Sequence, residues 1–164
     1  MNAVHFHLLF NHVAILGVIF STLLFLVSYF KRNMIMIRTA QAGFILSALV
    51  AIPVFLTGES AEHAIRDYPA VVNSDIHEHE EVAEITIWFI YALGLLAISG
   101  FFLDRTKLIF KKWFMLLLLL LSLASSAAIG FTGFLGGYIR HPEIRVSQNN
   151  LPQPSPNDGT EEGE

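Results

Sequence analysis

The chain has 164 residues, of which 54% are hydrophobic and 15% charged, and its mean hydropathy is +0.56. Soluble domains carry about 25% charged residues, and the apolar residues here stand in four long blocks, which excludes a soluble enzyme, a nucleic-acid binder and a disordered chain. The net charge is −4 and cysteine is absent, which excludes disulfides, thiolate metal ligands and c-type haem attachment.

The four apolar blocks predict four membrane spans, because a bilayer core of about 30 Å needs roughly 20 apolar residues in a helix. In chain order, the predicted spans cover residues 8–30, 39–58, 83–103 and 113–138, each bound being approximate. We therefore expect an all-α protein, an integral membrane four-helix bundle formed by residues 1–146 and surrounded by lipid. The tail over residues 147–164 is acidic and rich in proline and asparagine, which predicts disorder or binding to a partner.

The charged residues divide unequally between the two sides of these spans. The short connections over residues 31–38 and 104–112 hold seven of the ten basic residues and a single acid, Asp104. The other side holds thirteen acids and three arginines, so the two faces carry +6 and −10. The positive-inside rule therefore predicts a multi-pass protein of a bacterial inner (cytoplasmic) membrane, with both termini in the periplasm or outside.

Small residues recur at three- and four-residue spacing along the fourth span. They are Ser122, Ser126, Gly130, Gly133 and Gly137. Such residues let helix backbones approach closely in lipid. The pattern favours packing within the bundle, with a homodimer through this face as the alternative.

All seven histidines fall on the acidic side, together with most carboxylates. A rise of 1.5 Å per residue places His12, Glu59 and Glu84 near one level, at the outer edge of the hydrocarbon. Ionisable groups at such depth usually face the bundle interior, and imidazole with carboxylate suits iron, zinc, copper or manganese. The predicted metal ligands are His12, Glu59, Glu62, His63, His77, Glu81 and Glu84.

Two other interpretations of the same residues stay open. Two facing imidazoles in an apolar slot can hold a b-type haem, although many carboxylates would repel its propionates. The candidates for cofactor binding are His7, His12, His77 and His141. The alternative without a cofactor is an ordinary solvated acidic surface. The pattern thus leaves a transition metal ion (iron, zinc or copper) and a b-type haem undecided.

Several segments resemble a bacterial membrane family, domain of unknown function number 2231. Residues 7–12 (HLLFNH) resemble its opening motif, residues 57–58 (TG) its Thr-Gly after the second span, and residues 136–141 (GGYIRH) its closing motif. His77 or His79 fits the histidine that opens its third helix.

The resemblance covers residues 5 to about 141 and departs from the family at Leu8 and Ala14, where the family has prolines. It implies a four-helix membrane domain that is sometimes fused to Rieske or cytochrome c modules, and hence redox chemistry at the outer face. It matches His7, His12 and His141 as motif positions and assigns no ligand.

The sequence therefore predicts a membrane protein with a periplasm-facing, His/Glu-lined metal or haem centre that supports electron transfer or redox metabolism. The alternative is a non-catalytic accessory or scaffold subunit of a larger membrane complex, with respiratory or other membrane subunits as partners. A metal-ion transporter fits less well, because the cytoplasmic halves of the spans contain no ionisable residue. The sequence has no nucleophile–base arrangement, phosphate loop or nucleotide fingerprint.

Overall fold

The computed structural model describes residues 3–66, 73–102 and 108–140. These residues form four helices: α1 (Ala3–Lys31), α2 (Met34–Ile65), α3 (Asn73–Gly100) and α4 (Leu108–Arg140). Each helix is long and apolar enough to cross a membrane, so the prediction of an all-helical chain with four membrane-competent helices is confirmed. His141 and the tail over residues 147–164 lie outside the described residues.

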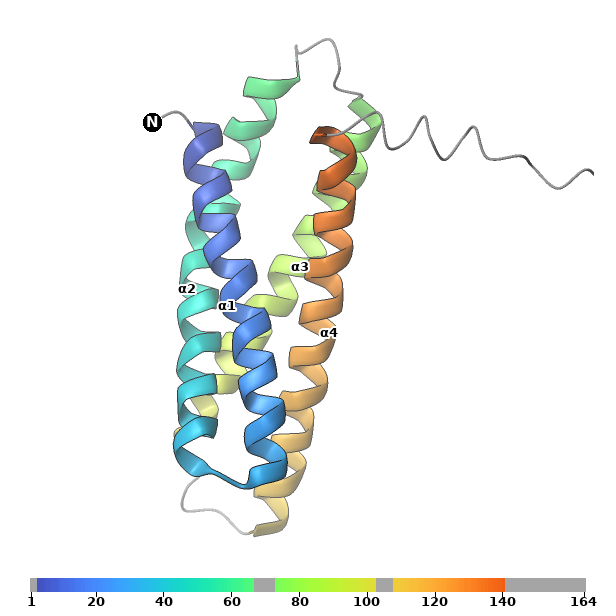
Figure 1. The fold of residues 1–164 in the computed structure, drawn as a ribbon. Coiled ribbons are helices and arrows are strands. Elements are labelled where there is room, and N and C mark those ends of the chain that lie inside the picture. The colour runs from blue at the N-terminus through green and yellow to red at the C-terminus, as the bar shows by residue number, and fades with distance from the viewer. Residues whose placement is uncertain (1–2, 67–72, 103–107, 141–164) are drawn as a thin grey trace, which may run out of the picture.

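The helices run alternately up and down, and each packs on its neighbour in the sequence, while α1 also packs on α4 (Figure 1). Helices α1 and α3 therefore lie diagonally opposite each other in the bundle. The start of α1, the end of α2, the start of α3 and the end of α4 share one end of the molecule (Figure 1). We call it the acidic end, because its helical segments carry Glu59, Glu62, Asp75, Glu78, Glu80, Glu81 and Glu84.

The opposite end, which we call the basic end, carries Lys31, Arg32, Arg38 and Lys112. A tight turn joins α1 to α2 there, with Arg32 at a positive φ of 52°. The side chain of Asn33 then caps α2, because its Oδ1 accepts hydrogen bonds from the backbone N–H groups of Ile35 and Met36 at 3.0 and 3.1 Å. This turn sets the antiparallel pairing of α1 and α2.

A row of residues on each helix faces the bundle axis and recurs about every seven residues. On α1 this interior row includes Ala14, Ser21 and Ser28, with Val18 and Phe25 between them, all buried. Residues seven apart share a helix face, so the row runs straight along the bundle. The large side chains that are fully buried are Phe25, Phe44, Leu93, Leu118 and Val18.

These large side chains all lie in the middle or toward the basic end, where the rings of Phe25 and Phe44 stand 6.0 Å apart. The tightest packing between α1 and α2 depends on glycine. A Cβ on Gly17 would overlap Ser47 Oγ, and a Cβ on Gly43 would overlap Ser21 Oγ. The two helices therefore approach each other more closely than larger side chains would allow.

The small residues of α4 lie in two different environments, one packed against α1 and one open. The Ser126 hydroxyl donates to Thr22 Oγ1 at 3.1 Å, and Ser122 is fully buried, so these two serines pack against α1 as the sequence indicated. At Gly130, Gly133 and Gly137, in contrast, an added Cβ would meet no described atom within 4 Å. That part of the face is not used for packing among the described residues.

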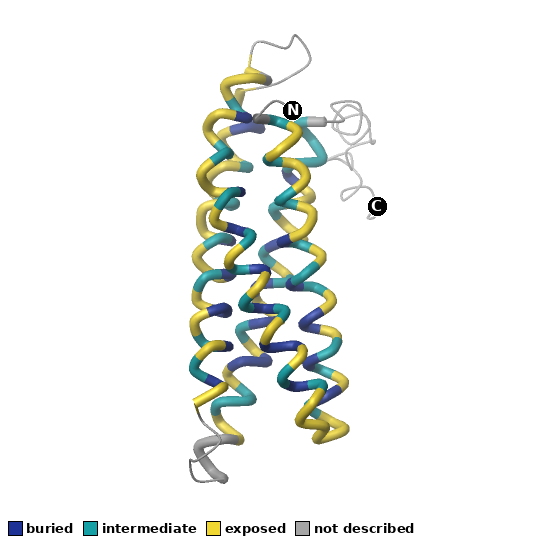
Figure 2. Tube along the Cα trace, turned by 90° about the vertical axis from the view of Figure 1, so that its left-hand side faces the viewer, coloured by how far each residue is buried: buried dark blue, intermediate teal, exposed yellow. Residues whose placement is uncertain are grey.

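Large apolar side chains cover the outside of the bundle. Phe20 is 66% exposed and Leu95 69%, and similar residues stand along all four helices. Figure 2 shows the exposed residues along the outer faces of the helices and the buried ones toward the axis. Such a surface is costly in water and is typical of helices surrounded by lipid. The structure therefore supports a bilayer environment.

Candidate functional site

His7 lies on α1 at the acidic end and is half-buried against α2. Its Nδ1 stands 3.1 Å from the Val54 carbonyl oxygen and 3.3 Å from Thr57 Oγ1. Thr57 donates its own proton to the Pro53 carbonyl at 2.6 Å, so its hydroxyl oxygen can only accept from the histidine. Since a carbonyl also only accepts, the proton of a neutral His7 sits on Nδ1. The lone pair of His7 is then on Nε2.

His79 lies on α3 at the same end and is held in the same manner by α4. Its Nδ1 stands 3.1 Å from the Thr132 carbonyl oxygen, so Nδ1 is again the donor and Nε2 carries the lone pair. One layer deeper, the hydroxyls of Thr86 and Thr132 stand 2.8 Å apart. Because Thr132 donates to the Ala128 carbonyl, Thr86 donates to Thr132. This contact fixes the register of α3 against α4 below the histidine.

A glycine lies beside each histidine ring, four residues after the carbonyl that accepts from it. A Cβ built on Gly58 would lie 3.8 Å from His7 Cε1, and one on Gly136 would lie 3.3 Å from His79 Cε1. The α1–α2 and α3–α4 hairpins are therefore alike. In each, the first helix carries the histidine, and the second helix supplies the carbonyl that accepts from its ring and the glycine beside it.

The structure places His12 away from this pair. His12 is exposed, and its Nδ1 stands 2.6 Å from the Leu8 carbonyl oxygen of its own helix. Glu59 and Glu84 are exposed as well, on α2 and α3. The structure therefore does not bring His12, Glu59 and Glu84 together, although they lie at similar depth.

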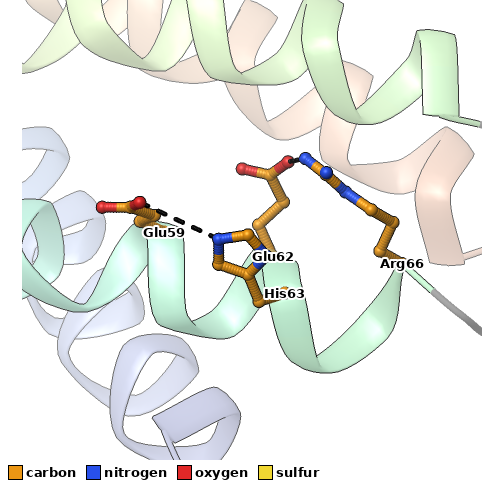
Figure 3. A network of polar contacts seen from close by, with 4 residues as sticks. All are labelled: Glu59, Glu62, His63 and Arg66. Carbon is orange, nitrogen blue, oxygen red and sulfur yellow. Dashed lines mark hydrogen bonds and ion pairs between the residues drawn. The ribbon is translucent and has the colours of Figure 1, made fainter.

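The other predicted ligands form pairs one helical turn apart on the surfaces of α2 and α3. His63 Nε2 stands 3.8 Å from Glu59 Oε1, and Glu62 forms an ion pair with Arg66, as Figure 3 shows. On α3, His77 Nε2 stands 3.3 Å from Glu81 Oε1, with side chains 73% and 67% exposed. The two His–Glu pairs are contacts of a solvated helix surface, whereas the Glu62 side chain is only 13% exposed.

Across residues 3–66, 73–102 and 108–140, no three histidine, aspartate or glutamate side chains gather closely enough to hold a metal ion. The predicted set of carboxylate and histidine ligands is therefore not assembled in this part of the chain. His141 lies outside the described residues. The described acidic end holds two half-buried imidazoles, His7 and His79, and one buried carboxylate, Asp75.

His79 was absent from the ligands predicted on spacing and depth, which favoured His77. The signal that separates them is the interior row of α3, in which Gly100, Leu93, Thr86 and His79 follow each other at intervals of seven residues. Leu93, Thr86 and Gly100 are all buried. His77 is two positions from His79 and faces the other way.

No protein-family model matches the chain, and comparison with curated proteins and with solved structures found no match either. The resemblance to domain of unknown function number 2231 therefore stays a prediction.

Proposed function

We propose that this protein is a multi-pass protein of the bacterial inner membrane that carries a redox-active metal centre between His7 and His79. The observation that supports it is the pair of half-buried imidazoles, each with Nδ1–H held by a backbone carbonyl. Metal-binding histidines usually have this arrangement, because the hydrogen bond fixes the ring and makes the other nitrogen a better ligand.

The charge distribution supports an orientation with the acidic end in the periplasm. The basic end holds Lys31, Arg32, Arg38 and Lys112 among the described residues, and basic connections favour the cytoplasmic side. Both termini and the metal centre would then face the periplasm. A centre near that surface can exchange electrons with a partner in the water phase.

Electron transfer is the role that the surroundings of the two histidines favour. Glu59, Glu81 and Glu84 are exposed on α2 and α3, Glu62 is paired with Arg66, and the buried Asp75 is also engaged in an interaction. Thr86 and Thr132 use their hydroxyls to hold the helices together. An electron carrier needs no acid–base group and no substrate pocket, only a metal held in fixed geometry. Respiratory or other membrane-complex subunits are the partners that this role implies.

The test is the metal content of the full-length protein purified in detergent. We expect one metal per chain in the wild type and a loss of at least tenfold in affinity for His7→Ala, because removing a ligand weakens a site sharply. His12→Ala is the matched control, since it removes an exposed histidine from the same helix. A wild-type protein free of metal would contradict the proposal and favour the accessory or scaffold subunit.

A further inference from the structure

An open groove of about 500 Å³ lies at the basic end, between the start of α2 and the residue that follows α3. It is lined by Met34, Ile35, Arg38, Thr39, Ala42 and Phe101. Its apolar side chains are accessible from outside the bundle, since Ile35 is 79% exposed and Phe101 43%. Arg38 carries the one charge among these six residues. The groove therefore combines an apolar surface with a single cation.

Two contacts with the end of α3 hold the guanidinium of Arg38 at this groove. Its central carbon stands 4.6 Å from the centre of the Phe101 ring, and its Nη1 donates to the Gly100 carbonyl oxygen at 3.4 Å. A guanidinium has five N–H donors in a planar fork, a geometry that matches the oxygens of a phosphate. A cation that is already ordered loses less conformational entropy when it binds an anion.

The groove lies at the depth where lipid headgroups meet the helices. Arg38 is four residues after the first residue of α2, about 6 Å along the helix axis. Side chains on a helix lean toward its N-terminus, which for α2 is the basic end (Figure 1). Long cationic side chains near the end of a membrane helix place their charge at the headgroup level in this way.

The charges around the groove favour an anion. Lys31 and Arg32 stand three and two residues before Met34, and the positive end of the α2 dipole lies here. The negative end of the α3 dipole is offset by the hydrogen bond from Arg38 to the Gly100 carbonyl. Every aspartate and glutamate among residues 3–66, 73–102 and 108–140 lies at the acidic end. No described carboxylate therefore competes with an anion for Arg38.

We propose that this groove binds an anionic phospholipid, with the phosphate at Arg38 and an acyl chain along the apolar side chains. Basic pockets between membrane helices bind anionic headgroups through the same combination of charge and apolar surface. Free phosphate would leave the apolar surface unused, and a zwitterionic lipid would bring its own cation toward Lys31 and Arg32. The site lies at the opposite end from His7 and His79 and does not depend on a metal there.

The experiment measures lipid binding to the full-length protein in detergent and about 0.5 M salt, where general attraction to a basic surface is largely screened. Delipidated protein is titrated with phosphatidylglycerol, or with phosphatidylcholine that has the same acyl chains. A lipid that binds the folded state raises the unfolding temperature as its concentration increases, which gives an apparent affinity. We expect phosphatidylglycerol to bind about tenfold more tightly than phosphatidylcholine, and inorganic phosphate to give no shift.

Substitutions of basic residues test the role of the charge. Arg38→Gln should lower the affinity for phosphatidylglycerol to about that for phosphatidylcholine. Arg38→Lys keeps the charge without the planar fork, so its affinity should fall between those of wild type and Arg38→Gln. Lys112→Gln is the matched control and should bind as the wild type does, because it removes an exposed positive charge from the same end but outside the groove.

Substitutions of exposed alanines test the role of the apolar surface. Ala42→Phe fills the groove and keeps both contacts of Arg38, so the affinity for phosphatidylglycerol should fall severalfold. Ala92→Phe, the control, adds the same ring to an exposed position of α3 outside the groove and should leave the affinity unchanged. If Arg38→Gln does not fold, the comparison of Ala42→Phe with Ala92→Phe still decides the proposal.

Four results would overturn the proposal. Equal affinities for the two lipids would remove the recognition of charge. Equal losses in Arg38→Gln and Lys112→Gln would assign the attraction to the basic end as a whole. Full affinity in Ala42→Phe would place the lipid elsewhere, and a response to inorganic phosphate as large as that to phosphatidylglycerol would make the site one for a free anion. None of these results bears on the metal content of the protein.

Discussion

His7 and His79 occupy equivalent places in the two helical hairpins of this bundle. Each ring donates from Nδ1 to a backbone carbonyl on the next helix, Val54 for His7 and Thr132 for His79, at 3.1 Å in both cases. In each hairpin a glycine follows four residues after that carbonyl, beside the ring. Two similar hairpins thus bring two similarly held imidazoles to one end of the bundle, and the proposed metal centre depends on this relationship.

The glycine contacts predict a difference between two otherwise similar substitutions. In Gly136→Ala, the new methyl group would lie 3.3 Å from His79 Cε1, so the ring must shift by a few tenths of an ångström. In Gly58→Ala, the methyl group would lie 3.8 Å from His7 Cε1, an ordinary contact. We expect Gly136→Ala to weaken metal binding several-fold and Gly58→Ala to leave it nearly unchanged. Equal affinities, measured by metal titration, would contradict the His79 geometry.

The packing of α1 on α2 predicts a large effect on stability. Gly43→Ala would drive a methyl group into Ser21 Oγ, and overpacking of this kind costs about 1–3 kcal/mol. Gly130→Ala meets no described atom within 4 Å and should be neutral, or stabilising by up to about 1 kcal/mol through helix propensity. Unfolding in mixed detergent measures both. Ser21→Gly should recover part of the loss in the Gly43→Ala background, and its failure would place the clash elsewhere.

The exposed pair of His77 and Glu81 on α3 should contribute little to stability. His77→Ala and Glu81→Ala each remove a contact between side chains that are mostly exposed, and such pairs contribute little. We expect the free energy of unfolding to change by less than about 0.5 kcal/mol in each variant. Metal content should also stay at the wild-type level. A marked loss of bound metal in either variant would contradict this expectation and make His77 and Glu81 part of the metal centre.

The orientation can be tested with single cysteines, because the chain has none of its own. Ser74→Cys lies at the acidic end and Ile35→Cys at the basic end, and both positions are exposed and uncharged. We expect an impermeant thiol reagent added outside to label Ser74→Cys and to spare Ile35→Cys until the membrane is opened. The reverse pattern would place the acidic end in the cytoplasm.

The sequence sufficed for the four helices because long apolar blocks determine membrane spans with little help from tertiary contacts. Depth was also predictable, and it gathers the histidines at one end. The direction in which each side chain points around its helix was harder to predict. His12 is five residues from His7, about 140° around the helix, so the two cannot face the same neighbour. Depth alone favoured His12, whereas the interior row that runs through Ser28, Ser21 and Ala14 leads to His7.

The contacts of the two rings could not be read from the sequence. They depend on which face of α1 meets α2 and which face of α3 meets α4, and close helix approach decides this at positions such as Gly43 and Ser21. The same holds for the carboxylates. A histidine and a glutamate four residues apart, such as His77 and Glu81, form a pair on any exposed helix surface. Their spacing carries no information about a third ligand.

The most direct test compares two double variants of the full-length protein for bound metal per chain. His7→Ala/His79→Ala removes the two interior imidazoles, whereas His12→Ala/His77→Ala removes two exposed ones from the same helices. We predict that the first double variant loses the metal while remaining helical, and that the second retains one metal per chain. Metal retained by His7→Ala/His79→Ala, or lost only from His12→Ala/His77→Ala, would contradict a centre between His7 and His79.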